Sequence, residues 1–256
     1  MMLLTDYPDR SVFEFAAGRG WEIGTCGVIY HHNAPKGPDG LPDPAQLDEW
    51  YATQILAAQA SGCVACMLDN ECPDLALACD GDKAATARMS RPLRIAADAR
   101  LRAGYYTPGT VAMQFATGDG GVRTWDNATA SQMDTEIGMW LRCSPLVARQ
   151  RAVFPTLYDH YEGALPVETC RNLQSVSLCR RAFGLRKTIL PVVCHHRRGD
   201  AAQPVLHGDE FRRQQIDPAV IGGADGIMWW TAGMQLANVP TLRDDLTRLC
   251  SYLPRV

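Results

Sequence analysis

Two carboxylates, Asp69 and Glu71, stand two residues apart directly after an apolar run at 63–68. The run is short and is bounded by Gly62 and Pro73, which predicts a strand that is buried on both faces. Because side chains alternate along a strand, both carboxylates would point the same way at its carboxyl end. That end is where parallel α/β folds bind ligands and carry out chemistry. The simpler alternative is that the acids end the strand in water and that one of them caps the next turn.

Polar and aromatic residues also follow the other segments that we expect to be strands. In a barrel the carboxyl ends of all strands face one mouth, so these residues would gather there. Aromatic faces stack on sugar rings, hydroxyl and amide groups bond sugar hydroxyls, and a pair of carboxyl groups is what glycoside cleavage needs. The residues expected at this mouth are His31, His32, Asn33, Asp69, Glu71, Tyr105, Tyr106, Tyr158, Asp159, His160, His195, His196, Trp229 and Trp230.

Adjacent residues on a strand point to opposite faces, which limits how many of these side chains can serve one site. We therefore expect one of Trp229 and Trp230 to pack in the core, and Tyr105 and Tyr106 to divide in the same way.

The histidines allow a metal site as an alternative. Four of the six lie in two adjacent pairs, at 31–32 and 195–196, and adjacent side chains diverge. A metal site would therefore have to be assembled across strands. A metal-assisted hydrolase that uses His31, His195 and Asp69 stays open on this reasoning.

Apolar segments of strand length alternate with segments of helical periodicity, and no hairpin signal appears. This alternation predicts a parallel sheet with helices outside it. No G-x-G-x-x-G follows the first strand, which weighs against a dinucleotide-binding fold. We expect one (β/α) TIM-type barrel domain over residues 1–256, irregular and with seven or eight strands. The expected strands are 24–30, 63–68, 104–108, 153–158, 188–194 and 226–230, and the expected helices are 44–60, 90–103, 131–142, 167–183, 210–224 with a break at Pro218, and 242–252; residues 11–16 fit a strand or a short helix, and 117–131 a loop.

Composition and charge narrow the class of protein. With 46% hydrophobic and 21% charged residues, the chain can bury a core of useful size. The formal net charge of −3 and the absence of a dominant basic stripe argue against nucleic acid as the main partner. The sequence contains no run of 18 apolar residues, so we expect no membrane span. The apolar start at 1–4 is too short for a signal peptide, so we expect a cytosolic protein or one whose leader is absent from this sequence, with secretion or association with a virion left open.

Ten cysteines are many for a chain of this kind. Cys63, Cys66 and Cys194 fall in apolar runs, where cysteine behaves as a small hydrophobic residue. Cys72 and Cys79 lie in an expected loop and would be able to form a disulfide in an oxidising compartment.

The order of several short motifs resembles that in barrel glycosidases of the hyaluronidase type and in neighbouring N-acetylhexosaminidase families. Each motif is short, and the resemblance depends on their order and spacing over residues 63–230. The matching pieces are Met67-Leu68-Asp69-Asn70-Glu71, Val153-Phe154-Pro155-Thr156-Leu157-Tyr158, Leu190-Pro191-Val192-Val193 and Gly222-Gly223-Ala224-Asp225-Gly226-Ile227-Met228-Trp229-Trp230.

The resemblance implies roles for individual residues. Glu71 would be the general acid, and Asp69 would orient the 2-acetamido group of the substrate, whose carbonyl attacks in place of an enzyme nucleophile. Tyr158 would assist, and Trp229 or Trp230 would form the floor of the sugar site. Together these roles describe hydrolysis of a β-linked polysaccharide that contains N-acetylhexosamine, with no metal or organic cofactor.

The remaining mouth residues would contact the glycan. The expected substrate-binding residues are His31, Asn33, Tyr106, His160, His195, Trp229 and Trp230. The chain departs from the family at Cys72, where a second acidic residue often follows the Glu, and the hyaluronidase disulfides cannot be matched to these cysteines. A carbohydrate-binding barrel without catalysis, on a surface or a virion, is therefore an alternative function.

Overall fold

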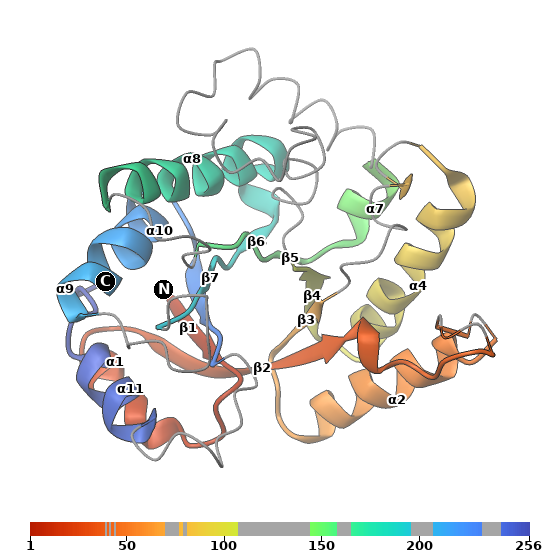
Figure 1. The fold of residues 1–256 in the computed structure, drawn as a ribbon, viewed down its shortest axis with the longest axis horizontal. Coiled ribbons are helices and arrows are strands. Elements are labelled where there is room, and N and C mark those ends of the chain that lie inside the picture. Colours follow the sequence, from red (N-terminus) through yellow and green to blue (C-terminus); the bar gives the residue numbers. More distant parts are fainter. Residues whose placement is uncertain are drawn as a thin grey trace. The chain divides into compact units, whose positions relative to one another are not determined.

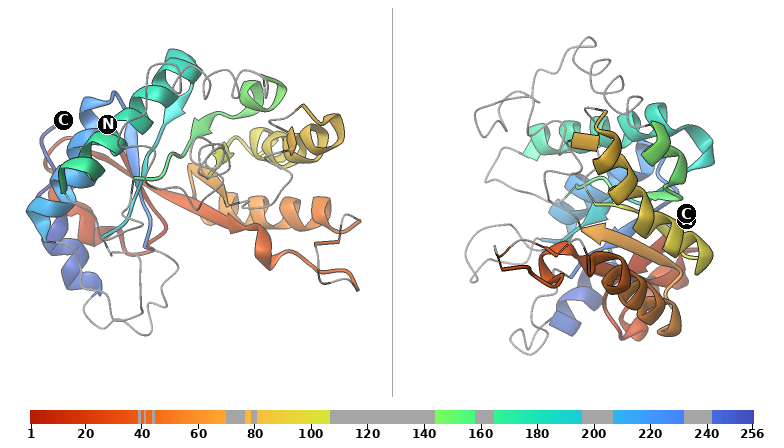
Figure 2. Two further views of the ribbon diagram at one scale, coloured as in Figure 1. Left: turned by 45° about the horizontal axis from the view of Figure 1, so that its top comes forward. Right: turned by 90° about the vertical axis from the view of Figure 1, so that its right-hand side faces the viewer.

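The computed structural model describes residues 1–38, 40, 42–43, 45–69, 77–78, 81–106, 144–157, 165–195, 207–231 and 242–256 (Figures 1 and 2). They form two compact units, each built from segments that lie far apart in the sequence. The terminal unit comprises Met1–Thr25, Pro155–Arg180 and Thr188–Val256, and the central unit comprises Cys26–Phe154 and Arg181–Lys187. Among the described helices, none is both long and apolar enough to span a membrane.

A parallel sheet organises the terminal unit. Its strands lie side by side in the order β7 (Val192–Val193), β8 (Gly226–Trp229), β1 (Met2–Thr5) and the first half of β2 (Glu22–Tyr30). The short strand β6 (Thr188–Ile189) precedes β7 in the chain. Strand β1 was not expected from the sequence, because four residues are too few to show a period. It is nevertheless central, since it pairs with β2 on one side and β8 on the other (Figure 1).

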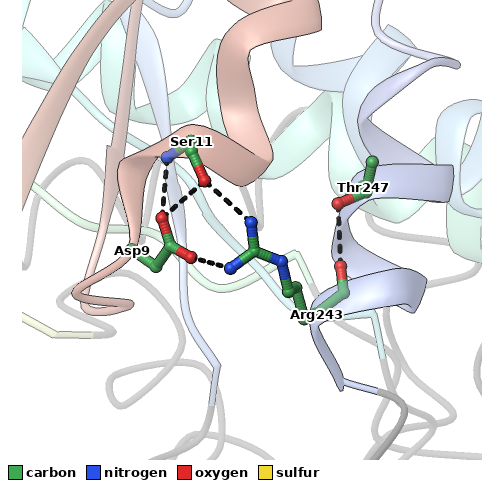
Figure 3. A network of polar contacts seen from close by, with 4 residues as sticks. All are labelled: Asp9, Ser11, Arg243 and Thr247. Carbon is green, nitrogen blue, oxygen red and sulfur yellow. Dashed lines mark hydrogen bonds and ion pairs between the residues drawn. The ribbon is translucent and has the colours of Figure 1, made fainter.

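The described residues of the terminal unit also form several helical segments. They are the 3₁₀ helix η1 (Arg10–Phe13), α1 (Glu14–Ala17), the larger part of α8 (Leu165–Phe183), α9 (Gly208–Phe211), the π-helical segment η5 (Arg212–Ile216), α10 (Asp217–Ile221) and α11 (Leu242–Cys250). Residues 11–16 are thus helical, which decides between the two expected conformations. A polar network joins η1 to α11: Asp9 accepts from the N–H and the hydroxyl of Ser11 at 3.0 and 2.7 Å, and Arg243 bonds both residues (Figure 3).

The central unit is built on a parallel sheet of three neighbouring strands. The second half of β2 pairs with β3 (Ala65–Asp69), and β3 pairs with β4 (Arg102–Tyr105). The helices α2 (Leu47–Ala60) and α4 (Lys83–Asp98) share one hydrophobic core with these strands. The 3₁₀ helices η2 (His31–Asn33) and η4 (Gly184–Arg186), α7 (Ser144–Arg149) and β5 (Ala152–Val153) complete the described elements.

A glycine allows the close packing of α2 on the sheet. A Cβ atom on Gly27 of β2 would lie 2.8 Å from the Cβ of Ala58 in α2, closer than two carbon atoms can approach. The helix can therefore approach β2 this closely only because position 27 has no side chain.

The helix expected at 90–103 is present as α4, but both of its predicted ends were wrong: α4 starts earlier and ends earlier than expected. Helix α4 begins seven residues earlier, where the side chain of Asp82 caps it by accepting from Ala85 N at 2.7 Å. Arg100 adopts a left-handed conformation with φ of 60°, which ends the helix and turns the chain into β4 at Arg102.

Two prolines act differently from the sequence expectation. The expected strand at 188–194 is interrupted at Pro191, which has no N–H for a strand ladder, so that β6 and β7 are separate short strands. Pro218, expected to break a helix, lies in the first turn of α10, where its missing N–H costs little. The chain passes from α9 through the π-helical segment η5 into α10. The expected helix at 131–142 and loop at 117–131 lie outside the described residues.

Candidate functional site

Asp69 ends β3 between two tyrosines of the neighbouring strands. The register of the β2–β3 ladder places Tyr30 opposite Asp69. On the other side, Tyr106 N donates to Leu68 O at 2.9 Å, so Tyr106 lies beside Asp69 just beyond the end of β4. The carboxyl ends of three parallel strands therefore present one carboxylate flanked by two phenol side chains.

The alternation of side chains decides the face on which these groups project. Ile29, Leu68 and Tyr105 belong to the hydrophobic core that α2 and α4 cover. Their chain neighbours Tyr30, Asp69 and Tyr106 therefore project from the opposite face of the strands. Tyr105 and Tyr106 thus divide between the two faces, as their adjacent positions predicted.

Asp69 is only half-buried, although one of its two oxygens is covered. Its Oδ1 atom has almost no surface in contact with solvent, whereas the residue as a whole stays partly exposed. Tyr106 is 5% exposed and Tyr30 is half-buried. The exposed surface of the carboxylate therefore belongs to its other oxygen, which is the one that can meet a ligand.

His31 at the end of β2 is positioned by helix α2. Its Nδ1 atom lies 2.9 Å from the hydroxyl of Tyr51, and the two rings are stacked with centroids 6.1 Å apart. When the imidazole proton is on Nε2, the Tyr51 hydroxyl donates to Nδ1 and the Nε2–H group is a hydrogen-bond donor. The next two residues, His32 and Asn33, are exposed, and the His32 ring lies 5.3 Å from that of Tyr30.

In the terminal unit, the adjacent tryptophans have different environments. Trp229 is fully buried, with its ring centroid 5.6 Å from Phe13 and 4.8 Å from Phe211. Trp230 points to the other face of the sheet and is half-buried. Of the two side chains expected to form a sugar-binding floor, Trp229 is a core residue here and Trp230 keeps exposed surface.

His195 is also a core residue. It is 0% exposed, and the Trp229 indole N–H donates to its Nδ1 at 3.3 Å, which places the imidazole proton on Nε2. The preceding peptide is held by Gln215, whose side-chain amide donates to Cys194 O at 2.9 Å and accepts from Cys194 N at 2.8 Å. His195, expected at the mouth, thus has no surface for a glycan in this structure.

Sequence reasoning missed Asp6 and Tyr51. Asp6 follows β1, and its Oδ1 accepts from both the N–H and the hydroxyl of Thr231, at 2.8 and 2.9 Å. The sequence feature that could have revealed Asp6 is the short segment Met2–Thr5 directly before it. An acid also follows the apolar run of β3, but that run is longer. Tyr51 lies in the helix expected at 44–60, to which the sequence analysis assigned no part in the site. Tyr51 lies in the first turns of the helix that follows the carboxyl end of β2. This position could have indicated that its hydroxyl contacts the site residues there.

Several expected site residues lie outside the described part of the chain: Glu71, Tyr158, Asp159, His160 and His196, together with the cysteines Cys72 and Cys79.

Metal and thiol chemistry find little support in the described residues. Within them, no three His, Cys, Asp or Glu side chains gather in a way that could hold a metal ion. Burial raises the pKa of the Cys66 and Cys179 thiols to about 12, so neither forms a reactive thiolate near neutral pH. Among the described residues, these cysteines are not part of a disulfide: Cys26, Cys63, Cys66, Cys179, Cys194 and Cys250.

Comparison with known proteins gives a likeness in structure only. No family model matches the chain, and no curated protein matches it in sequence. Bee venom hyaluronidase, in a monoclinic crystal form, superimposes with a TM-score of 0.60 and 11% sequence identity over 90% of each chain. Bee venom hyaluronidase in complex with a hyaluronic acid tetramer gives a TM-score of 0.58 and 14% identity, again over 90% of each chain. The chain therefore shares a fold with this hyaluronidase, while closure of the barrel by seven or eight strands stays a prediction.

Proposed function

We propose that this protein is a glycoside hydrolase that cleaves a β-linked polysaccharide containing N-acetylhexosamine. The observation that supports the proposal is the position of Asp69, which lies at the carboxyl end of a parallel strand, on the face opposite to α2 and α4, and keeps exposed surface there. A solved structure of the same fold holds a hyaluronic acid tetramer, which supports a glycan as the substrate class.

In this mechanism the substrate supplies the nucleophile. The carbonyl oxygen of the 2-acetamido group attacks the anomeric carbon, while the Asp69 carboxylate accepts the acetamido N–H and holds the group in line. The bond from the anomeric carbon to the leaving oxygen breaks as Glu71 donates its proton to that oxygen. Glu71, now a carboxylate, then takes a proton from the water that opens the cyclic intermediate, which restores both the acid and the acetamido group.

Neighbouring groups have supporting roles in the proposal. Tyr30 and Tyr106 flank Asp69 and would border the bound sugar. His31, oriented by Tyr51, would donate from Nε2 to a sugar hydroxyl. Further glycan contacts are assigned to Asn33, Tyr158, His160 and Trp230; of these, Asn33 is exposed and Trp230 half-buried in the structure.

The test is turnover of defined glycans. Incubation with oligosaccharides of hyaluronan and of chitin should release new reducing ends, whereas glucans without a 2-acetamido group should stay intact because they lack the internal nucleophile. Cleavage of glucans at an equal rate would instead indicate a carboxylate nucleophile of the enzyme. Binding of the glycans with no release of reducing ends would indicate the carbohydrate-binding barrel without catalysis.

A further inference from the structure

A concentration of positive charge in the central unit has no part in the proposed catalytic site. Three described segments, 99–106, 144–154 and 181–187, contain no aspartate or glutamate. The chain as a whole has 28 acidic and 25 basic residues, so a local excess of this kind does not follow from composition. The cations in these segments are Arg100, Arg102, Arg149, Arg151, Arg181, Arg186 and Lys187.

The fold brings the three segments together. Lys187 Nζ donates to Ala148 O and Gln150 O at 2.7 and 2.6 Å, which fixes the end of η4 against the end of α7. Arg151 N donates to Ala103 O at 2.9 Å, which places Arg151 beside the first residues of β4. We call Arg102, Arg149, Arg151, Arg186 and Lys187 the basic surface.

Three charges of the basic surface, those of Arg149, Arg151 and Arg186, are available to a ligand. Its four arginines are exposed, and Lys187 is half-buried. Among the described residues, Arg149, Arg151 and Arg186 form no ion pair, in contrast to Arg91, which binds Asp48 at 2.5 Å. Burial, and in second place the charge of Arg151, lower the pKa of Lys187. Like charges gathered on one surface repel one another, and they raise the local concentration of anions.

The basic surface lies away from Asp69 within the same unit. Arg102 is the first residue of β4, and Asp69 is the last residue of the adjacent parallel strand β3. Parallel strands have their amino ends on one edge and their carboxyl ends on the other, so the two features occupy opposite edges. Leu185, 90% exposed beside Arg186, adds an apolar side chain next to the cations.

We propose that the basic surface binds an anionic polysaccharide at a site separate from Asp69. The planar guanidinium group forms paired hydrogen bonds with carboxylate and sulfate oxygens, and several such groups can follow the repeated charges of one chain. The choice of a polysaccharide among polyanions rests on the proposed function. A polymer held at this surface would keep its other segments at high local concentration near the enzyme.

Equilibrium binding of fluorescent heparin at low salt tests the proposal. The change is Arg151→Gln together with Arg186→Gln, which removes two exposed charges while keeping most of each side chain's volume. We expect the affinity for heparin to fall about tenfold, as two screened charge pairs predict, and the salt dependence to become shallower. The matched control is Arg213→Gln together with Arg255→Gln, two exposed arginines of the terminal unit with the same charge change, which should bind as the unchanged protein does.

Three outcomes would overturn the proposal: no binding of heparin by the unchanged protein, an equal loss in the control variant, or tighter binding of a single-stranded DNA of equal charge, which would indicate a nucleic-acid surface. The assay needs no turnover and is repeated with Asp69→Asn, which leaves the basic surface intact. Heparin binding without hydrolysis of any glycan would leave this proposal standing and contradict the proposed function. Hydrolysis of a glycan without heparin binding would contradict this proposal and leave the proposed function standing.

Discussion

The carboxyl ends of the strands in the two units carry the same kinds of residue but put them to different uses. At the end of β3 in the central unit, Asp69 and the neighbouring Tyr30 keep exposed surface on the face opposite to α2 and α4. In the terminal unit, Trp229 and His195 are fully buried. Trp229 packs against Phe13 and Phe211, and its indole N–H donates to His195. A polar or aromatic residue after a strand is therefore only a candidate, and the face on which it projects decides whether it can meet a ligand.

The largest expected effect concerns the proposed acid. Glu71→Gln should lower kcat by roughly 10²- to 10⁴-fold, the usual contribution of general acid catalysis, because an amide cannot supply the proton that the leaving oxygen requires. Thermal unfolding should barely change, since the two side chains have the same shape. Initial rates of reducing-end release measure the effect.

Asp69→Asn should also be slow, and the two losses should combine non-additively because the residues act as a unit. Full activity of Glu71→Gln would contradict the assignment of this motif as a glycosidase site. The strand end of the central unit would then no longer differ from that of the terminal unit by a catalytic role.

The second prediction contrasts the adjacent tryptophans. Trp229→Ala removes a fully buried side chain and should lower the free energy of unfolding by about 3–5 kcal/mol. Trp230→Ala removes a half-buried one and should cost about 1 kcal/mol or less. Urea unfolding measures both, and glycan binding should weaken only in the Trp230 variant. Equal losses of stability would show that both tryptophans serve the core.

The third prediction tests whether Asp6 is a structural acid, unlike Asp69. Asp6→Ala would leave the buried N–H of Thr231 without its acceptor and should lower the free energy of unfolding by about 1–3 kcal/mol. Asp6→Asn retains an acceptor oxygen and is the matched control, so it should cost clearly less. A large loss of activity in Asp6→Asn at unchanged stability would instead place Asp6 in the chemistry.

The smallest effect is expected at the surface network of Asp9, Ser11 and Arg243 (Figure 3). Hydrogen bonds from Ser11, and in addition the charge of Arg243, lower the pKa of the Asp9 carboxyl below its ordinary 3.8. A carboxyl with a lowered pKa stabilises the fold at pH values above 3.8, and that contribution is lost as the pH falls through the folded value.

Arg243→Gln should therefore destabilise the protein slightly at neutral pH, less than Asp6→Ala does. The difference from the unchanged protein should vanish in acid and shrink with added salt. Urea unfolding at several pH values would detect it, and a difference that grows as the pH falls would contradict this account.

Much of the fold could be predicted from the sequence because it depends on local pattern. The alternation of strand and helix, the parallel pairing and the position of Asp69 at a strand end all follow from apolar runs bounded by glycine and proline, and the structure confirms them. Two features of the fold were not predicted because their signals in the sequence are weak. Strand β1 is too short to show a period, and the interruption at Pro191 depends on one missing N–H within an apolar run.

The sequence by itself determined which neighbouring residues must separate: with a period of two, Trp229 and Trp230 cannot share a face, nor can Tyr105 and Tyr106. Only the tertiary structure decided which member of each pair faces the helices, because that choice depends on the register against the adjacent strands and on what covers them. The same reason applies to the basic surface. Its cations lie in three distant segments, and only the contacts of Lys187 and Arg151 bring them side by side.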